Sequence, residues 1–156
     1  MALENVNILK LSATALAGLF TGGAVFVNIV EIPALRNVTD TEAARKNWKE
    51  SFLLASRWQA GLGMATVVSG AAVYLLDESD NRNLWIIGSG VMASIFPWTM
   101  IVMMPDIKRL LKDNVVREQG GDWVRTKIEA WNKQHMFRSL VGVSVFGMFL
   151  YAINKV

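Results

Sequence analysis

Four long stretches of the chain are almost free of charged residues: residues 8–30, 54–76, 84–104 and 137–153. A helix needs about 20 apolar residues to cross roughly 30 Å of hydrocarbon, so each stretch can span a bilayer, the last near the lower limit. Of the 156 residues, 53% are hydrophobic and 19% are charged, which leaves no room for a separate soluble domain. We predict an all-α fold in which residues 1–156 form a single domain, an integral membrane four-helix bundle.

The first stretch is expected to be a span and not a cleaved signal, because Glu4 and no basic residue precede Lys10. The chain has no cysteine, which excludes disulfides, thiolate metal ligands and thiol nucleophiles. A metal or haem site needs more good ligands than one histidine and distant methionines supply. We therefore predict neither a metal nor a cofactor.

The basic residues gather in two of the three connections between these stretches. The first connection holds Arg36, Arg45, Lys46 and Lys49, and the last holds seven further basic residues. The short middle connection has only Arg82, against three acidic residues. By the positive-inside rule we expect a multi-pass protein with both basic loops in the cytosol and both termini on the opposite side; the organelle stays open. Basic residues beside spans meet lipid head groups, so we expect membrane lipids as partners and no nucleic acid.

The segments that precede the second and fourth spans have an amphipathic helical pattern. Asp40 or Thr41 can cap a helix that runs into the second span, and residues 120–122, Gly-Gly-Asp, can end one helix and cap the next. Tryptophans at the front of such helices are typical of the head-group region. We predict amphipathic interfacial helical extensions before spans two and four. The tryptophans expected to be interfacial anchors are Trp48, Trp58, Trp98, Trp123 and Trp131.

Polar residues inside spans are costly and usually face the interior of a bundle. Because consecutive spans alternate in direction, those of this chain map to the same, cytoplasmic end: Asn28, Glu31, Arg57, Gln59, Thr99, His135 and Arg138. Asn28 and Glu31 are three residues apart, and Trp131, His135 and Arg138 follow an i, i+4, i+7 stripe, so each set shares a helix face. Glu31 is the expected counter-ion of Arg57 or Arg138. This pattern predicts a polar pocket for a small, partly polar ligand.

A simpler interpretation of the same residues also stands. Arginines near helix ends can extend to the head groups, which would leave Arg57 and Arg138 without a role in a pocket. In the same way, His135 can cap or anchor an interfacial helix. Under this interpretation the polar residues only adapt the bundle to the membrane surface.

Several motifs carry a family resemblance. They are AGLFTGGAVFVNIVEIP at residues 17–33, Arg57-Trp58-Gln59, Pro97-Trp98-Thr99 with Met104-Pro105, and residues 131–138. With them the chain resembles, over nearly its whole length, the anthrone oxygenase-like family of small four-span membrane proteins, a domain of unknown function. Some fungal members are assigned to the oxidation of polyketide anthrones to anthraquinones with dioxygen and no recognised cofactor. The resemblance implies an oxidoreductase here: a cofactor-free oxygenase acting on a hydrophobic aromatic, anthrone-like substrate.

Such a reaction needs a base that deprotonates an activated carbon and groups that hold the resulting enolate. The resemblance implies that His135 is the base, that Arg57 and Arg138 stabilise the anion, and that Glu31 holds the histidine or an arginine. The ligand-binding residues would be Asn28, Gln59, Thr99 and Trp131. The alternative is a non-catalytic membrane protein that binds a lipid or small metabolite or acts as an assembly partner. A homo-oligomer stays open.

The distribution of basic residues predicts the topology. Reporter fusions at either terminus should lie outside the cytosol, and an accessibility tag inserted near Asn114 should lie within it. A terminus found in the cytosol would reverse the orientation.

Overall fold

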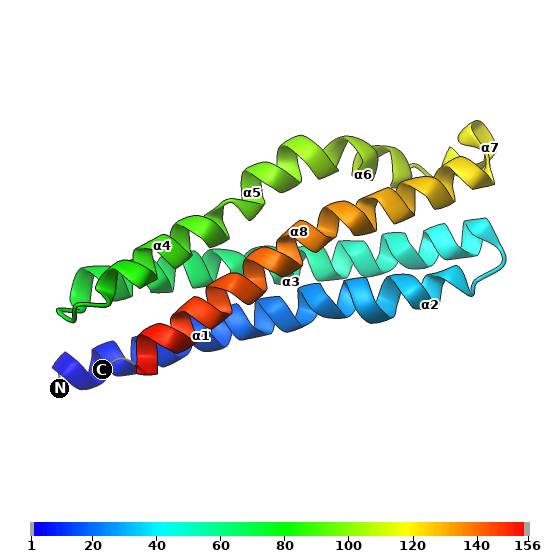
Figure 1. Ribbon diagram of the computed structural model, residues 1–156. Coiled ribbons are helices and arrows are strands. Elements are labelled where there is room, and N and C mark those ends of the chain that lie inside the picture. The colour runs from blue at the N-terminus through cyan, green and yellow to red at the C-terminus, as the bar shows by residue number, and fades with distance from the viewer. Residues whose placement is uncertain (1, 155–156) are drawn as a thin grey trace.

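The computed structural model describes residues 2–154 as helices joined by short turns (Figure 1). Residues 1, 155 and 156 of the predicted domain lie outside the described part. The first span consists of α1 (Ala2–Phe26), the π-helix η1 (Val27–Glu31) and α2 (Ile32–Arg36). The second is α3 (Thr41–Leu76). The third comprises α4 (Arg82–Ala93), α5 (Ile95–Trp98), the π-helix η2 (Thr99–Met103) and α6 (Met104–Leu110), and after α7 (Val115–Gln119) the fourth is α8 (Gly121–Asn154).

Four helical stretches are long and apolar enough to cross a membrane: Glu4–Arg36, Thr41–Leu76, Arg82–Leu110 and Gly121–Ile153. The predicted all-α four-helix bundle is confirmed, and the chain is a multi-pass membrane protein. Consecutive spans alternate in direction, so the start of α1, the end of α8 and the α3–α4 turn lie at one end, on the left in Figure 1. The other two connections lie at the opposite end, which we call the loop end.

The predicted extensions of spans two and four are continuous parts of α3 and α8. The 36 residues of α3 correspond to about 54 Å of helix, more than the roughly 30 Å of hydrocarbon. The Asp40 side chain caps α3 by accepting hydrogen bonds from the backbone N–H groups of Glu42 and Ala43 at 3.2 and 3.3 Å. Gly120 separates α7 from α8 with a φ of +85°, a left-handed conformation that glycine adopts at no steric cost. Both predicted helix starts are therefore confirmed.

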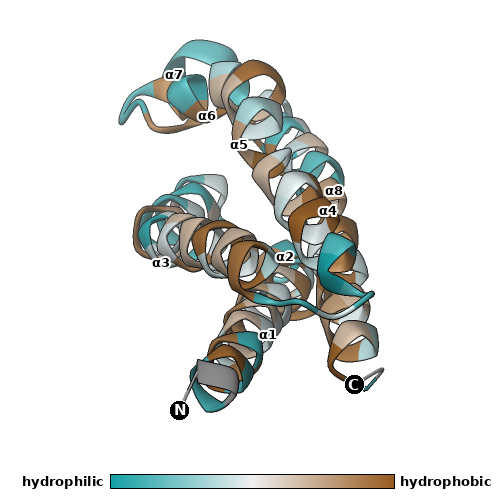
Figure 2. Cartoon of the chain, turned by 90° about the vertical axis from the view of Figure 1, so that its left-hand side faces the viewer, coloured by the Kyte–Doolittle hydropathy of each residue, from teal (hydrophilic) through white to brown (hydrophobic). Residues whose placement is uncertain are grey.

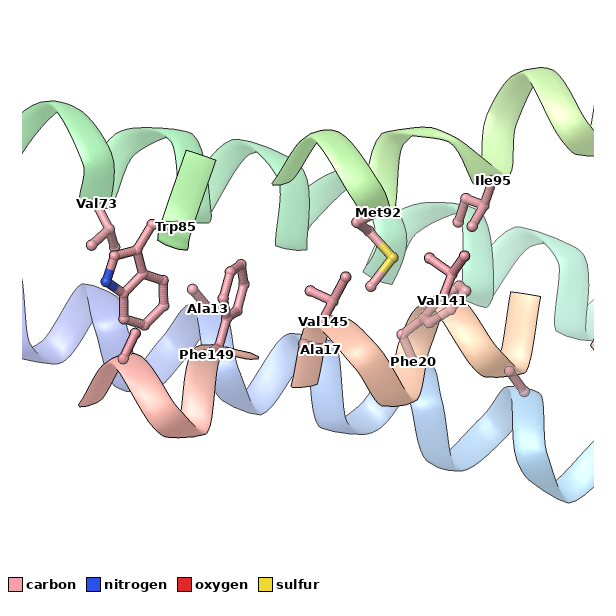
Figure 3. Close-up of a cluster of buried hydrophobic side chains, with 12 residues drawn as sticks. Ala13, Ala17, Phe20, Val73, Trp85, Met92, Ile95, Val141, Val145 and Phe149 are labelled. Carbon is pink, nitrogen blue, oxygen red and sulfur yellow. The ribbon is translucent and has the colours of Figure 1, made fainter. Parts of the chain in front are cut away.

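Buried apolar side chains form two clusters on either side of the bundle's middle. The terminal core, shown in Figure 3, lies in the half of the bundle that contains the chain ends. Its members include Ala13, Ala17, Phe20, Val73, Trp85, Met92, Ile95, Val141, Val145 and Phe149. In this core α4 and α8 approach so closely that a Cβ atom on Gly88 would collide with the Phe149 ring. The loop core lies toward the loop end and includes Val27, Ile32, Trp48, Met103, Ile107, Leu110, Val115, Val124, Ile128 and Trp131.

Two of the tryptophans expected to be interfacial anchors are buried in the loop core. Trp48 is 0% and Trp131 4% exposed, so the interpretation of these two as anchors is wrong. The Trp48 ring stacks on Phe52 with centroids 5.3 Å apart and meets the edge of Trp131 at 5.5 Å. Their aromatic surface is used for packing between α3 and α8. Trp58, by contrast, is 74% exposed and points away from the bundle.

The outer surface of the terminal half is apolar, as a surface in contact with lipid requires. Leu19, Val68 and Leu75 on α1 and α3 are 60–78% exposed. Figure 2, which views the bundle end-on, shows hydrophobic segments on the outside of α1 and α3 and a largely hydrophilic α7. An exposed apolar surface of this extent is typical of a membrane-spanning bundle.

Prolines explain why the first and third spans are irregular. A proline has no N–H and its ring clashes with the carbonyl four residues earlier, which for Pro33 and Pro105 lies within η1 and η2 respectively. In each π-helix the backbone widens so that the next N–H, of Ile32 or Met104, bonds to the carbonyl five residues back. Pro97 interrupts the third span in a different way, because α4 ends at Ala93, four residues before the proline, and α5 begins at Ile95. From this bend onward the backbones of α5, η2 and α6 pack mainly against α8, although Arg45 of α3 still donates a hydrogen bond to the Leu110 carbonyl of α6 at 3.3 Å.

A buried ion pair joins the first span to the turn between α3 and α4. The Lys10 ammonium on α1 lies 2.9 Å from the Asp77 carboxylate, which follows α3, and both side chains are more than nine-tenths buried. The Asp77 carboxylate also accepts a hydrogen bond from the Ser79 hydroxyl at 2.7 Å. The pair joins the first span to the α3–α4 turn, a contact that the sequence analysis did not anticipate.

Replacement of Asp77 by Asn should destabilise the protein, because it leaves the Lys10 ammonium buried without a counter-charge. Removing one partner from a buried ion pair costs about 3–5 kcal/mol, and we expect the free energy of unfolding in detergent at neutral pH to fall by that amount. Asp80→Asn is the matched control, since Asp80 is exposed in the same turn. Equal effects of the two substitutions would show that the buried pair adds no stability.

The same pair predicts a loss of stability in acid. Burial raises the pKa of Asp77, but hydrogen bonds from Ser79 and Lys10 outweigh burial and hold the pKa below its ordinary value. The resulting stabilisation is present above the unfolded pKa of about 3.9 and is lost as pH falls through the folded pKa. Below about pH 4 the Tm of the wild-type protein should therefore fall more steeply than that of Asp77→Asn. Parallel curves would contradict this assignment.

Candidate functional site

A layer of polar side chains lies between the terminal core and the loop core. We call it the polar layer; its members are Asn28, Gln59, Asn132, His135, Arg138 and Ser139. Four of them come from one face of α8, between Trp131 of the loop core and Val141 of the terminal core. Apolar clusters on both sides shield the layer from water, so its hydrogen bonds must be made within the protein.

The Asn28 side chain is the centre of the layer. It projects from η1, whose wide turn faces α8. Its amide nitrogen donates to the backbone carbonyl and to the side-chain oxygen of Asn132, at 3.0 and 2.6 Å. Its oxygen accepts from the Ser139 hydroxyl at 2.5 Å and lies 3.3 Å from Nδ1 of His135. One amide therefore contacts three residues of α8 and fixes the first span against the fourth.

The Arg138 guanidinium is the buried cation of the layer. Arg138 is 7% exposed, and its Nη2 donates to Oε1 of Gln59 on α3 at 2.8 Å. The guanidinium carbon also lies 5.8 Å from the centre of the Phe20 ring, a cation–π distance. Its Nε is fully buried and has no hydrogen-bond partner among the described residues. A charged donor left unpaired in an apolar surrounding is costly, so the described residues satisfy the Arg138 guanidinium only in part.

Two hollows meet at Arg138. A small one is lined by polar-layer residues together with Glu31, Phe52 and Trp131. The other is a cavity of about 360 Å³ between α3 and the bent third span, which we call the lateral cavity. Its walls are almost entirely apolar or aromatic: Phe52, Ser56, Ala60, Ile95, Phe96, Thr99, Met100, Met104, Ile107 and Leu111, with Arg138. Because Met100 is 64% exposed, the lateral cavity opens on the outer surface of the bundle.

The structure brings most of the predicted site residues together. Asn28, Gln59, His135 and Arg138 belong to the polar layer. Trp131 packs against His135 with ring centres 5.1 Å apart. Two further predicted residues, Glu31 and Thr99, each line one of the hollows. Glu31 lines the small hollow, and Thr99 lines the lateral cavity while its hydroxyl donates to the Ile95 carbonyl at 2.7 Å.

Two of the predicted contacts are not made. Arg57 is exposed and lines neither hollow, because it lies two residues from the buried Gln59 and so on the opposite side of α3. Glu31 was expected to pair with Arg57 or Arg138, yet the salt bridges among residues 2–154 do not include it. Gln59 takes the place of that counter-ion at Arg138.

The sequence analysis missed several residues of the site. Asn132 and Ser139 lie three residues before and four after His135, so helical spacing alone places them on its face. They were overlooked because both are common at ordinary polar positions of a helix. Phe52 and Ser56, which line both hollows, carry no signal in the sequence. Within the described part of the chain, no group of three or more His, Cys, Asp or Glu side chains is placed to hold a metal ion.

The fold and the site together define a multi-pass membrane bundle with a shielded polar layer beside an apolar cavity. Comparison with known families makes the assignment specific: residues 48–148, more than half of the chain, match the family model described as anthrone oxygenase. The chain belongs to the anthrone oxygenase family. No curated protein and no solved structure matches it. The matched region contains Gln59, His135 and Arg138, and it begins after Asn28.

Double-mutant cycles should identify the partner of Arg138. We expect a coupling free energy of about 1.5–3 kcal/mol between Gln59→Leu and Arg138→Met, the range for a hydrogen bond to a charged group. The cycle of Glu31→Gln with Arg138→Met should give less than about 0.5 kcal/mol, because no ion pair joins these residues. Unfolding in detergent with a chemical denaturant measures both. The opposite order of coupling would restore Glu31 as the counter-ion.

Proposed function

We propose that the protein is a membrane-embedded oxygenase that needs no cofactor and acts on a hydrophobic aromatic substrate of the anthrone type. The observation that carries the proposal is the buried guanidinium of Arg138, which lines the lateral cavity and has no acidic partner among the described residues. A cation held in an apolar cavity stabilises a negatively charged oxygen far more than it would in water. Membership of the anthrone oxygenase family supports the same chemistry.

The lateral cavity suits a flat, apolar ligand. Its volume of about 360 Å³ falls within the range of about 300–1,000 Å³ typical of small-molecule sites. Phe52 and Phe96 offer aromatic surface for stacking, and Arg138 is the only charged side chain that lines it. Because the cavity opens on the outer surface of the bundle, a lipid-soluble substrate can enter from the bilayer without passing through water.

In the proposed reaction His135 acts as the base and Arg138 as the anion stabiliser. His135 takes a proton from the methylene carbon of the substrate, and the electron pair moves through the aromatic system to the ketone oxygen, which becomes an enolate oxygen held by Arg138. The enolate carbon then forms a bond to dioxygen, and the resulting peroxide anion takes the proton back from His135 to give a hydroperoxide. Loss of the second methylene proton breaks the O–O bond and releases water. One oxygen atom ends in the new carbonyl and the other in water, so no external reductant is needed.

We also propose that the site lies in the cytosolic leaflet. The polar layer lies between the terminal core and the loop end, where both basic connections are found. The positive-inside rule assigns that end to the cytosol, so the proposed substrate would enter from the cytosolic leaflet. A non-catalytic lipid- or metabolite-binding protein would use the same cavity but would consume no oxygen, and the assay below separates the two functions.

The proposal is tested with the full chain reconstituted in lipid nanodiscs and supplied with a hydroxylated anthrone. Oxygen uptake and anthraquinone absorbance should exceed the rate of protein-free autoxidation, and ¹⁸O₂ should place one labelled atom in the quinone. His135→Asn should lower the rate by about 10²–10⁴-fold, as expected for loss of a base. Arg138→Gln should lower it by about 10²–10³-fold, as expected for loss of an oxyanion donor.

Arg57→Gln is the matched control, because it makes the same substitution at an exposed arginine that lines neither hollow. It should keep the wild-type rate. Anthrone retention by all variants with no oxygen uptake above the protein-free rate would reject the oxygenase and favour the binding protein.

A further inference from the structure

The orientation of the Asn28 amide follows from a single group that cannot change its role. The backbone carbonyl of Asn132 has no hydrogen to donate, so the atom of Asn28 that lies 3.0 Å from it must be the NH₂ group. The same nitrogen donates its second hydrogen to Oδ1 of Asn132 at 2.6 Å. Both hydrogens of the Asn28 amide are therefore used toward Asn132, and its oxygen faces the other way.

The Asn28 oxygen in turn determines which nitrogen of His135 carries a hydrogen. A carbonyl oxygen has two lone pairs and can only accept. One is taken by the Ser139 hydroxyl at 2.5 Å, and the other faces Nδ1 of His135 at 3.3 Å. Nδ1 must therefore be the donor, and in a neutral imidazole the hydrogen on one nitrogen leaves a lone pair on the other. Nε2 makes no hydrogen bond with the described residues and has that lone pair free.

We infer that Asn28 is a positioning residue that holds His135 in its Nδ1–H tautomer, so that Nε2 is the proton acceptor of the site. His135 lines the small hollow, which shares Arg138, Phe52 and Ser56 with the lateral cavity. The ligand class follows from these two groups: it has an acidic C–H or O–H directed at Nε2 and an oxygen that becomes anionic at Arg138. The role of Nε2 as a base rests on the proposed function, but the tautomer does not.

The backbone around Asn28 explains why this amide is held so firmly. η1 is a π-helix, a wide turn that often occurs at functional sites, and it forms where Pro33 prevents the regular bond pattern. In η1 Asn28 faces α8 and contacts residues 132, 135 and 139, which lie on one face of that helix. An amide with all of its donors and both acceptor positions engaged cannot flip without losing several buried hydrogen bonds.

The tautomer can be measured directly, because His135 is the only histidine in the chain. Protein labelled with ¹⁵N-histidine in nanodiscs gives one pair of imidazole nitrogen resonances. Long-range ¹H–¹⁵N correlations distinguish Nε2, which couples to both ring C–H protons, from Nδ1, which couples to one. We expect Nδ1 protonated and Nε2 unprotonated at neutral pH. Protonation of Nε2, alone or together with Nδ1, would overturn the inference in the wild-type protein itself.

Two variants then test whether Asn28 is the cause. Asn28→Leu has a similar volume but no amide, and it should shift the population toward the Nε2–H tautomer that a free imidazole side chain prefers. Asn132→Ala is the matched control, because it removes Oδ1 of Asn132 and keeps the backbone carbonyl that orients Asn28. It should retain the Nδ1–H tautomer. An unchanged tautomer in a folded Asn28→Leu protein would remove Asn28 from this role.

Failure of the inference and failure of the proposed function give different results. An Nδ1–H tautomer without anthrone turnover would reject the oxygenase and leave the positioning role of Asn28 in place. Turnover in a protein with an Nε2–H tautomer would keep the oxygenase and reject Asn28 as the positioning residue. If the proposed function and the positioning role of Asn28 are both correct, Asn28→Leu should lower kcat for the anthrone much more than it raises KM. The reason is that Asn28 does not line the lateral cavity in which the anthrone would bind.

Discussion

The hydrogen bonds of the Asn28 side chain are the contact on which the middle of this bundle depends. In a membrane, moving an apolar side chain from the lipid to the interior of the bundle gains little free energy, because both surroundings are apolar. Close packing and hydrogen bonds between helices therefore decide how the spans fit together. Asn28 bonds to Asn132 and Ser139 and faces His135, which fixes the register between the first and fourth spans. The Arg138–Gln59 bond then attaches α3 to the same face of α8. Three spans thus meet in one shielded layer, whose polarity is compatible with the membrane because its bonds are internal.

Two prolines give the first and third spans the same local defect with opposite consequences. η1 and η2 each precede a proline and each widen the backbone. In the first span the wide turn faces α8 and contributes Asn28, whose hydrogen bonds hold the first span against the fourth. In the third span, η2 follows a separate bend near Pro97, and the lateral cavity lies between this part of the span and α3, with Thr99 and Met100 of η2 in its wall. A rigid polar layer and an open apolar cavity therefore lie side by side, and Arg138 belongs to both.

The electrostatics of the site explain why so few charged groups suffice for the proposed chemistry. Arg138 is held by one neutral partner, so its charge is not neutralised by a carboxylate and remains available to an anionic ligand. A salt bridge with Glu31 would have cancelled much of that charge. The buried ion pair of Lys10 with Asp77 lies apart from this layer, at the end of the bundle that holds the chain termini, where it fixes the first span to the α3–α4 turn. The buried ion pair and the Arg138 cation are thus separated along the length of the protein.

The sequence by itself determined the four spans, the all-α fold and the helix starts at Asp40 and Gly120, because hydropathy and capping are local properties of a segment. It also identified Asn28, Gln59, His135 and Arg138, since polar residues in a span stand out wherever they face. Only the tertiary structure decided between Arg57 and Gln59, which are two residues apart on a helix and cannot both face inward. It likewise decided that Trp48 and Trp131 are buried, because the exposure of each ring depends on which helices pack against it. Contacts between segments far apart in the sequence produce three further features: the Lys10–Asp77 pair, the lateral cavity and the unpaired Nε of Arg138. No local sequence pattern predicts them.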